Sequence, residues 1–137
     1  MAHNLEKIYQ DFEKEQIQVL PYRFRHLKSV ALEAEKVIGI DPSKIQGKAE
    51  EYTILIHEKG HFDSGAFYSA ASPYALRGQA EYRADRAAIL RYIPLEELRE
   101  CVAGGMVEIW ELADHFGVTE DFMRKAVAFY QDTPGIR

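Results

Sequence analysis

The sequence predicts an α+β fold that is mostly helical, with a small β element near the N-terminus. Apolar residues recur with a helical period in residues 4–16, 43–62 and much of 79–131. Between the first two of these segments, apolar residues instead alternate from Val30 to Ala34, which is typical of a strand. The length of 137 residues and a hydrophobic content of 47% suit one domain with its own core.

The N-terminal third is predicted to hold one helix and the β element. Residues 4–16 form a short amphipathic helix, because its apolar residues share one face: Leu5, Ile8, Tyr9 and Phe12. An extended segment follows and is interrupted at Pro21. Residues 30–40 contain one or two short strands, which can pair as a hairpin before the Asp-Pro-Ser turn at residues 41–43.

Two long helices are predicted in the middle of the chain. The first begins near Ser43, a favourable N-cap residue, and its apolar residues again share one face: Ile45, Ala49, Tyr52 and Ile56. Residues 63–78 are rich in Ser, Gly, Ala and Tyr, so they predict a loop. The second helix covers residues 79–93 and ends before Pro94.

The C-terminal segment is predicted to be helical for most of its length. A short helix starts at Pro94 and stops at the Gly104–Gly105 pair. Two further helices, residues 106–116 and 120–131, are joined by a Gly-Val-Thr turn. The glycine of this turn suits a helix C-terminus and its threonine suits an N-cap. These two helices form the C-terminal helical hairpin of the predicted fold.

Charge and cysteine content restrict the function classes. The formal net charge is −5, and an acidic chain is repelled by phosphate groups, so neither direct nucleic-acid binding nor attachment to an anionic membrane is expected. A single cysteine, Cys101, allows no disulfide within the chain, which suits a reducing compartment. Neither an apolar signal segment nor a membrane-spanning stretch is evident. We therefore expect a cytoplasmic protein with no membrane partner.

The sequence His-Glu-Lys-Gly-His at residues 57–61 is the strongest functional signal. Residues four apart share one face of a helix, so His57 and His61 can direct their imidazoles at one metal ion. Glu58 is turned about 100° away and can act instead on a water molecule bound to that ion. This division of roles is typical of zinc peptidases, with zinc as cofactor and Glu58 as catalytic base. The same residue pattern also arises by chance. Lys59 within it and Asp63 just after it depart from the stricter form of the motif.

A third protein ligand is expected on the second long helix, since catalytic zinc sites commonly have three. Glu81 and Asp85 lie one turn apart there. Glu81 can complete the coordination, and Asp85 can accept a hydrogen bond from the free N–H of a ligand histidine. The alternative is a solvated helix face, in which Arg83 and Arg86 pair with these carboxylates. The upstream motif favours the metal-site interpretation.

The order of these residues resembles the ImmA/IrrE family of metallopeptidases from phages and mobile elements. Members typically carry a His-Glu-x-Gly-His helix, then a helix of the form Glu-x-x-Ala-(Asn/Asp)-x-x-Ala that ends in a Leu-rich run and a proline. Gly60 matches the motif glycine. The matching residues of the second helix are Glu81, Ala84, Asp85, Ala88, Leu90 and Pro94. The resemblance covers roughly residues 17–95 and extends more loosely to Tyr130. Two positions depart from the family pattern. Lys59 stands where members usually have an apolar residue, and Ala87 stands where they often have phenylalanine.

The resemblance implies a zincin-like fold in which His57, His61 and Glu81 hold zinc and Glu58 is the base. The whole chain, residues 1–137, would then be one zincin-like metallopeptidase domain. Its catalytic part would cover about residues 17–95 and a C-terminal helical extension about residues 95–131. The resemblance also implies a protein substrate: a repressor or other regulator of a phage, prophage or mobile element, cleaved so that repressed genes are expressed.

Two tyrosines and a histidine are further candidates for contact with a substrate or with a developing oxyanion. Tyr68 and Tyr74 lie in the predicted loop of residues 63–78, which is expected to border the cleft that holds the metal ion, so they can line a substrate groove. His115 lies in the C-terminal hairpin. The alternative role of His115 is that of a surface or capping histidine, near a helix C-terminus where positive charge is favourable.

Other functions compete with the endopeptidase interpretation. A non-catalytic interaction module, stabilised by a metal, would bind a transcriptional regulator through its cleft or its terminal hairpin. Residues 111–130 also have the spacing of a helix-turn-helix, but the acidic start of the second helix and the acidic chain favour a hairpin packed on the core. Manganese and iron suit the same two-histidine, one-carboxylate ligand set as zinc.

Overall fold

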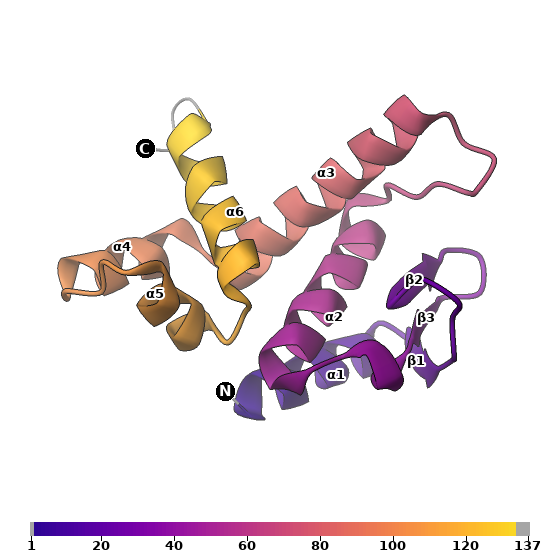
Figure 1. Ribbon diagram of the computed structural model, residues 1–137, viewed down its shortest axis with the longest axis horizontal. Helices are drawn as coiled ribbons and strands as arrows, with labels where there is room; N and C mark the ends of the chain where they lie inside the picture. Colours follow the sequence, from indigo (N-terminus) through magenta and orange to yellow (C-terminus); the bar gives the residue numbers. More distant parts are fainter. Residues whose placement is uncertain (1, 134–137) are drawn as a thin grey trace.

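The computed structural model describes residues 2–133 and shows a mixed α+β architecture in which helices dominate (Figure 1). The elements are, in chain order, α1 (Ala2–Lys14), β1 (Gln18–Pro21), β2 (Ser29–Leu32), β3 (Val37–Ile40), the 3-10 turn η1 (Pro42–Lys44), α2 (Gly47–Ser64), α3 (Tyr74–Tyr92), α4 (Leu95–Ala103), α5 (Ile109–Phe116) and α6 (Glu120–Asp132). The predicted α+β class, with a small β element near the front, is therefore confirmed. Within the described residues, every helix is too short or too polar to cross a membrane.

The small sheet has three strands in the order β1-β3-β2. The predicted hairpin is confirmed, since β2 runs antiparallel to β3 with Ser29 opposite Ile40. The segment before it also belongs to the sheet, because β1 runs parallel to β3 with Gln18 opposite Val37. Pro21 is tolerated as the last residue of β1 because this strand lies at a sheet edge. The other edge strand, β2, leads to the functional site described below.

The long helix does not begin at Ser43, as the sequence predicts, but at Gly47. The buried carboxylate of Asp41 accepts hydrogen bonds from the backbone N–H and the hydroxyl of Ser43, which closes the short turn η1 instead. Gly47 then has a φ of 86°, a conformation that favours glycine and that cannot continue a right-handed helix. The chain therefore changes direction between η1 and α2.

Helices α2 and α3 form the centre of the molecule and cross at close range (Figure 1). Gly60 of α2 faces the backbone of Ala84 in α3, and a Cβ added at Gly60 would lie 2.1 Å from the Ala84 carbonyl oxygen. Helix α3 begins at Tyr74, earlier than predicted, after Pro73 in an extended conformation. Gly78 in the second turn disfavours a helix and hides this start from the sequence pattern, so the loop is shorter than expected.

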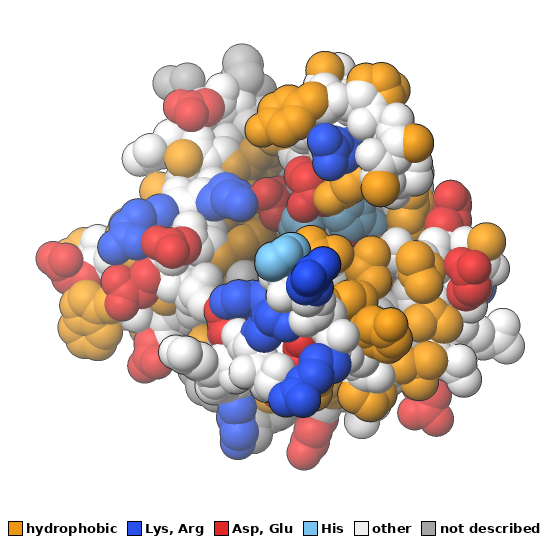
Figure 2. Space-filling model, turned by 45° about the vertical axis from the view of Figure 1, so that its right-hand side comes forward, with side chains coloured by type: hydrophobic (Ala, Val, Ile, Leu, Met, Phe, Trp, Pro, Cys, Tyr) orange, Lys and Arg blue, Asp and Glu red, His pale blue; other side chains and the backbone are white. Residues whose placement is uncertain are grey.

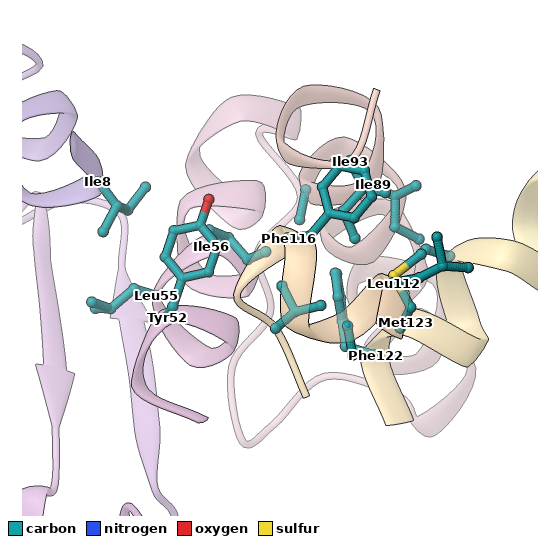
Figure 3. Packing of buried hydrophobic residues seen from close by; sticks show 14 of the residues in the cluster. Ile8, Tyr52, Leu55, Ile56, Ile89, Ile93, Leu112, Phe116, Phe122 and Met123 are labelled. Carbon is teal, nitrogen blue, oxygen red and sulfur yellow. The ribbon is translucent and has the colours of Figure 1, made fainter. Parts of the chain in front are cut away.

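One cluster of buried hydrophobic side chains joins both halves of the chain, from Ile8 in α1 to Tyr130 in α6. Figure 3 shows side chains of α2 on one side of this cluster and those of α3, α5 and α6 on the other. The predicted turn of the C-terminal hairpin is confirmed, because Gly117 has a φ of 74° and the Thr119 hydroxyl accepts a hydrogen bond from the Phe122 N–H. Helix α5 starts at Ile109 rather than residue 106, since Glu108 and Glu111 form a capping box there.

Lys59, the charged residue inside the histidine motif, is fully buried with its ammonium group in an ionic network. Its Nζ contacts Asp63 one turn further along α2 and lies 2.8 Å from Glu15 at the end of α1. Arg91 of α3 lies 3.5 Å from Glu15 and 3.0 Å from Asp63. Lys59 and Arg91 thus tie α1, α2 and α3 together through these carboxylates.

Candidate metal centre

Three side chains from α2 and α3 converge as a possible ligand set. His57 and His61 lie one turn apart on α2, with their ring centroids 4.9 Å apart. Glu81 of α3 reaches both rings: its carboxylate oxygens lie 3.1 Å from His57 Nε2 and 2.8 Å from His61 Nε2. The three potential ligand atoms all lie within 4.8 Å of one another. Two Nε2 atoms and one carboxylate oxygen are a donor set that zinc accepts.

The Nδ1 atom of each histidine has an acceptor of its own, so both rings are fixed in orientation. His57 Nδ1 lies 2.7 Å from the Asp85 carboxylate, one turn beyond Glu81 on α3. His61 Nδ1 lies 2.6 Å from the backbone carbonyl of Ala66, just after the end of α2. With each Nδ1 donating to its own acceptor, Nε2 is the nitrogen of each ring that faces Glu81 and that a metal ion could bind.

The carboxylates beside His57 and His61 stabilise positive charge on the two imidazole rings. Burial lowers the pKa of His57, but the hydrogen bonds with Asp85 and Glu81 outweigh burial and raise that pKa to about 10. Burial likewise opposes protonation of His61, yet its pKa is also raised, because Glu81 and the Ala66 carbonyl favour the cation. The two histidines in turn hold the pKa of Glu81 well below its usual range. A divalent cation would supply the positive charge that these carboxylates attract, so the residues fit a metal ion.

Glu58 follows His57 on α2 and is only 5% exposed. Its Oε2 accepts a hydrogen bond of 2.5 Å from the Ser29 hydroxyl, at the start of the edge strand β2. Burial raises the pKa of Glu58, although the Ser29 hydrogen bond and the nearby histidines favour its charged form. A buried carboxyl group next to a candidate metal site is placed to accept and return a proton.

Beyond Glu81 and Asp85, the C-terminal extension also reaches the site. Lys125 of α6 lies 2.9 Å from the second carboxylate oxygen of Asp85. Burial raises the pKa of Asp85, but the contacts with His57 and Lys125 outweigh it, so this carboxylate stays charged. The extension is therefore in contact with the residue that orients His57.

The three side chains considered for substrate or oxyanion contact have different surroundings. Tyr68 borders the site, with its ring 6.2 Å from that of His61, and burial followed by the charge of Glu81 raises the pKa of its hydroxyl. Tyr74 is not in a loop but begins α3, where it is 85% exposed beside Arg77. His115 Nε2 lies 2.9 Å from Glu97 of α4, so the structure does not bring it to the histidine pair.

Two residues near the site were not singled out by the sequence pattern. Ser29 is separated from Glu58 by 29 positions, and no local spacing predicts that contact. Arg77 lies one turn before Glu81 on α3, and its charge lowers the pKa of Tyr68. The predicted helix began at residue 79 and so left Arg77 in a loop. With a helix start at Tyr74, the four-residue spacing to Glu81 would have placed Arg77 on the same face.

Figure 2 shows histidine and acidic side chains within a recess of the surface, with lysine and arginine side chains and hydrophobic residues around it. Comparisons of the chain with protein-family models, with curated protein sequences and with solved structures find no match.

Proposed function

We propose that the protein is a zinc-dependent endopeptidase of zincin-like type, similar to the ImmA/IrrE metallopeptidases. The observation that carries the proposal is the convergence of His57 Nε2 and His61 Nε2 on the Glu81 carboxylate, with the buried Glu58 next to them. The His-Glu-x-x-His spacing supplies the histidines from one helix, and the close helix crossing supplies the glutamate from the next.

The residues of the chain divide the chemistry between them. His57, His61 and Glu81 would hold the zinc ion, which supplies a Lewis acid that polarises a carbonyl group and lowers the pKa of water. Glu58 takes a proton from the attacking water and returns it to the leaving amine. Asp85 holds the His57 ring in its orientation. Tyr68, which borders His61, donates a hydrogen bond to the developing oxyanion or to the substrate backbone.

The substrate is a protein, and on the resemblance to ImmA/IrrE members it is a repressor or other regulator of a phage or mobile element. The reaction would take place in the cytoplasm, where such regulators are found.

A second function is favoured by the same contacts. A metal at this position would tie α2 to α3, and the Asp85–Lys125 ion pair would extend the link to α6. The metal would then stabilise a non-catalytic module that binds a transcriptional regulator. In this case, loss of zinc would lower the free energy of unfolding without removing any turnover.

Metal content per chain tests the proposal most directly. The protein is purified without a chelator or metal-affinity tag, and zinc is measured by elemental analysis in wild type, Glu81→Ala and Glu96→Ala. Glu96 is an exposed glutamate on α4 and serves as the matched control. We expect close to one zinc per chain in wild type and control and a clear loss in Glu81→Ala. A wild-type protein without stoichiometric metal, even after zinc is added back, would refute a metal centre.

The Glu58→Gln variant separates the two functions. As an endopeptidase base, Glu58 is needed for turnover but not for zinc, so the variant should keep its metal and lose cleavage of candidate repressors. Binding of a repressor without cleavage by the wild type, unchanged in Glu58→Gln, would favour the interaction module.

A further inference from the structure

The loop between β1 and β2 is strongly basic although the chain as a whole is acidic. Residues 22–28, here named the basic loop, carry Arg23, Arg25, His26 and Lys28 and no acidic residue, whereas the formal net charge of the chain is −5. Within residues 2–133, neither Arg23 nor Arg25 forms an ion pair, and both side chains are exposed. Their charges are therefore available to a partner.

The basic loop is held in place by the buried Asp41. The Phe24 N–H donates to the Asp41 carboxylate at 3.0 Å, and the Asp41 N–H donates to the Lys28 carbonyl at 2.8 Å. Lys28 also pairs with Glu50 of α2 at 2.7 Å, which fastens the loop along the helix that carries His57 and His61. A loop with fixed ends loses less conformational entropy when it binds a partner.

The basic loop borders the metal centre. It runs directly into Ser29, whose hydroxyl contacts Glu58. Figure 2 shows a group of lysine and arginine side chains on the rim of the recess that contains histidine and acidic side chains. A polypeptide lying across the recess would therefore meet positive charge next to the position where Glu58 acts.

A third arginine without an ion pair lies on the other helix of the site. Arg77 precedes Glu81 by one turn of α3, and among the described residues its buried Nε has no hydrogen-bond partner. Its guanidinium group packs against the Tyr74 ring, with 5.5 Å between the guanidinium carbon and the ring centroid. The guanidinium group of Arg77 thus places a positive charge on the helix that carries Glu81, so a carboxylate from a bound chain would be favourable beside it.

We propose that the basic loop and Arg77 bind acidic side chains of the polypeptide on which the metal centre acts. The inference rests on the proposed endopeptidase function and adds that the substrate segment near the scissile bond is rich in aspartate or glutamate. Nucleic acid is a poorer occupant, because it needs a longer run of cations than this surface supplies. An acidic peptide needs only local pairing with Arg23, Arg25 and Arg77.

Binding of a synthetic peptide tests the proposal without knowledge of the natural substrate. A fluorescein-labelled peptide of alternating glutamate and alanine is titrated with zinc-supplemented Glu58→Gln protein and followed by fluorescence polarisation at low and physiological salt. The same peptide with glutamine in place of glutamate and a single-stranded oligonucleotide of equal length are the comparison probes. We expect the glutamate peptide to bind about tenfold or more tightly than the glutamine peptide, with an affinity that falls as salt is added.

Arginine variants identify the surface. In the Glu58→Gln background, the Arg23→Gln/Arg25→Gln protein and the Arg77→Gln protein should each bind the glutamate peptide several-fold more weakly. The matched control is Arg83→Gln/Arg86→Gln, which removes two exposed arginines from a different face of α3. Equal binding of the glutamate and glutamine peptides, unchanged binding by Arg23→Gln/Arg25→Gln, or preference for the oligonucleotide would each overturn the proposal.

The zinc content of the same preparations keeps the two proposals separable. Peptide binding through the basic loop does not require zinc. Retained, arginine-dependent binding by protein that takes up no zinc would therefore refute the endopeptidase function while supporting an acidic partner. Stoichiometric zinc without arginine-dependent binding would refute the acidic-substrate inference alone.

Discussion

Gly60 and Ala84 are in contact through their backbones, since a Cβ on Gly60 would lie 2.1 Å from the Ala84 carbonyl oxygen. This contact sets the separation of α2 and α3 in the same turn that holds His57 and His61 on one helix and Glu81 on the other. The geometry of the candidate metal centre therefore depends on a residue that has no side chain.

The Gly60→Ala substitution should force α2 and α3 apart. We expect a loss of about 1–3 kcal/mol or more in the free energy of unfolding, because the added methyl group meets rigid backbone. Zinc affinity should fall as well, because Glu81 moves away from the histidines. Urea denaturation with and without zinc measures both effects.

Gly78→Ala is the matched control, because Gly78 lies within α3 and has open space where a Cβ would be added. This change should leave stability unchanged or raise it by up to about 1 kcal/mol. Equal stability of Gly60→Ala and wild type would show that the helix crossing tolerates a larger separation.

The Asp85→Asn substitution should weaken zinc binding while leaving all three proposed ligands in place. Asp85 accepts the hydrogen bond from His57 Nδ1 at 2.7 Å, and removal of its charge makes His57 a poorer donor to the metal. Competition with a chromophoric chelator should show an affinity about 10–100-fold lower than wild type. The exposed Asp114 on α5 provides the control variant Asp114→Asn. If Asp85→Asn bound zinc as tightly as the control, Asp85 would act only as the partner of Lys125.

The Ser29→Ala substitution should destabilise the protein through Glu58. The Ser29 hydroxyl donates a hydrogen bond to this buried carboxylate, and its loss should cost about 1–3 kcal/mol of unfolding free energy at pH 8. In the Glu58→Gln background, where no charge is left unsatisfied, the same substitution should cost less. Urea denaturation of the four zinc-free proteins gives the coupling energy directly. Identical costs in the two backgrounds would contradict a specific role for this hydrogen bond.

Acid should destabilise the protein through Asp41. Hydrogen bonds from Lys44 and Ser43, opposed by burial, hold the pKa of this carboxyl well below its ordinary value of 3.8. The folded state therefore binds fewer protons than the unfolded state, so the contribution of Asp41 is complete above about pH 4 and is lost as the pH falls below that value. Thermal unfolding between pH 7 and pH 2.5 should show a steeper acid decline in wild type than in Asp41→Asn. The variant should also be less stable at neutral pH. Parallel pH profiles would mean that Asp41 contributes nothing to this decline.

Much of the fold was predictable because its signals are local. The hairpin of β2 and β3 follows from alternation of apolar residues, and the turn before α6 follows from Gly117 and Thr119, which suit a helix end and an N-cap. The errors fall at helix starts. Ser43 was expected to cap α2, but the buried Asp41 binds it in a separate turn, and burial of Asp41 is a tertiary property.

The sequence by itself determined which residues could meet. A spacing of four places His57 and His61 on one helix face, and the same spacing pairs Glu81 with Asp85, because both relationships depend only on helical geometry. Only the tertiary structure decided that these two faces meet, that Ser29 reaches Glu58, and that Lys59 is buried rather than solvated. These contacts join residues far apart in the chain, and their distances depend on how α2, α3 and the sheet pack, which no local pattern of residues specifies.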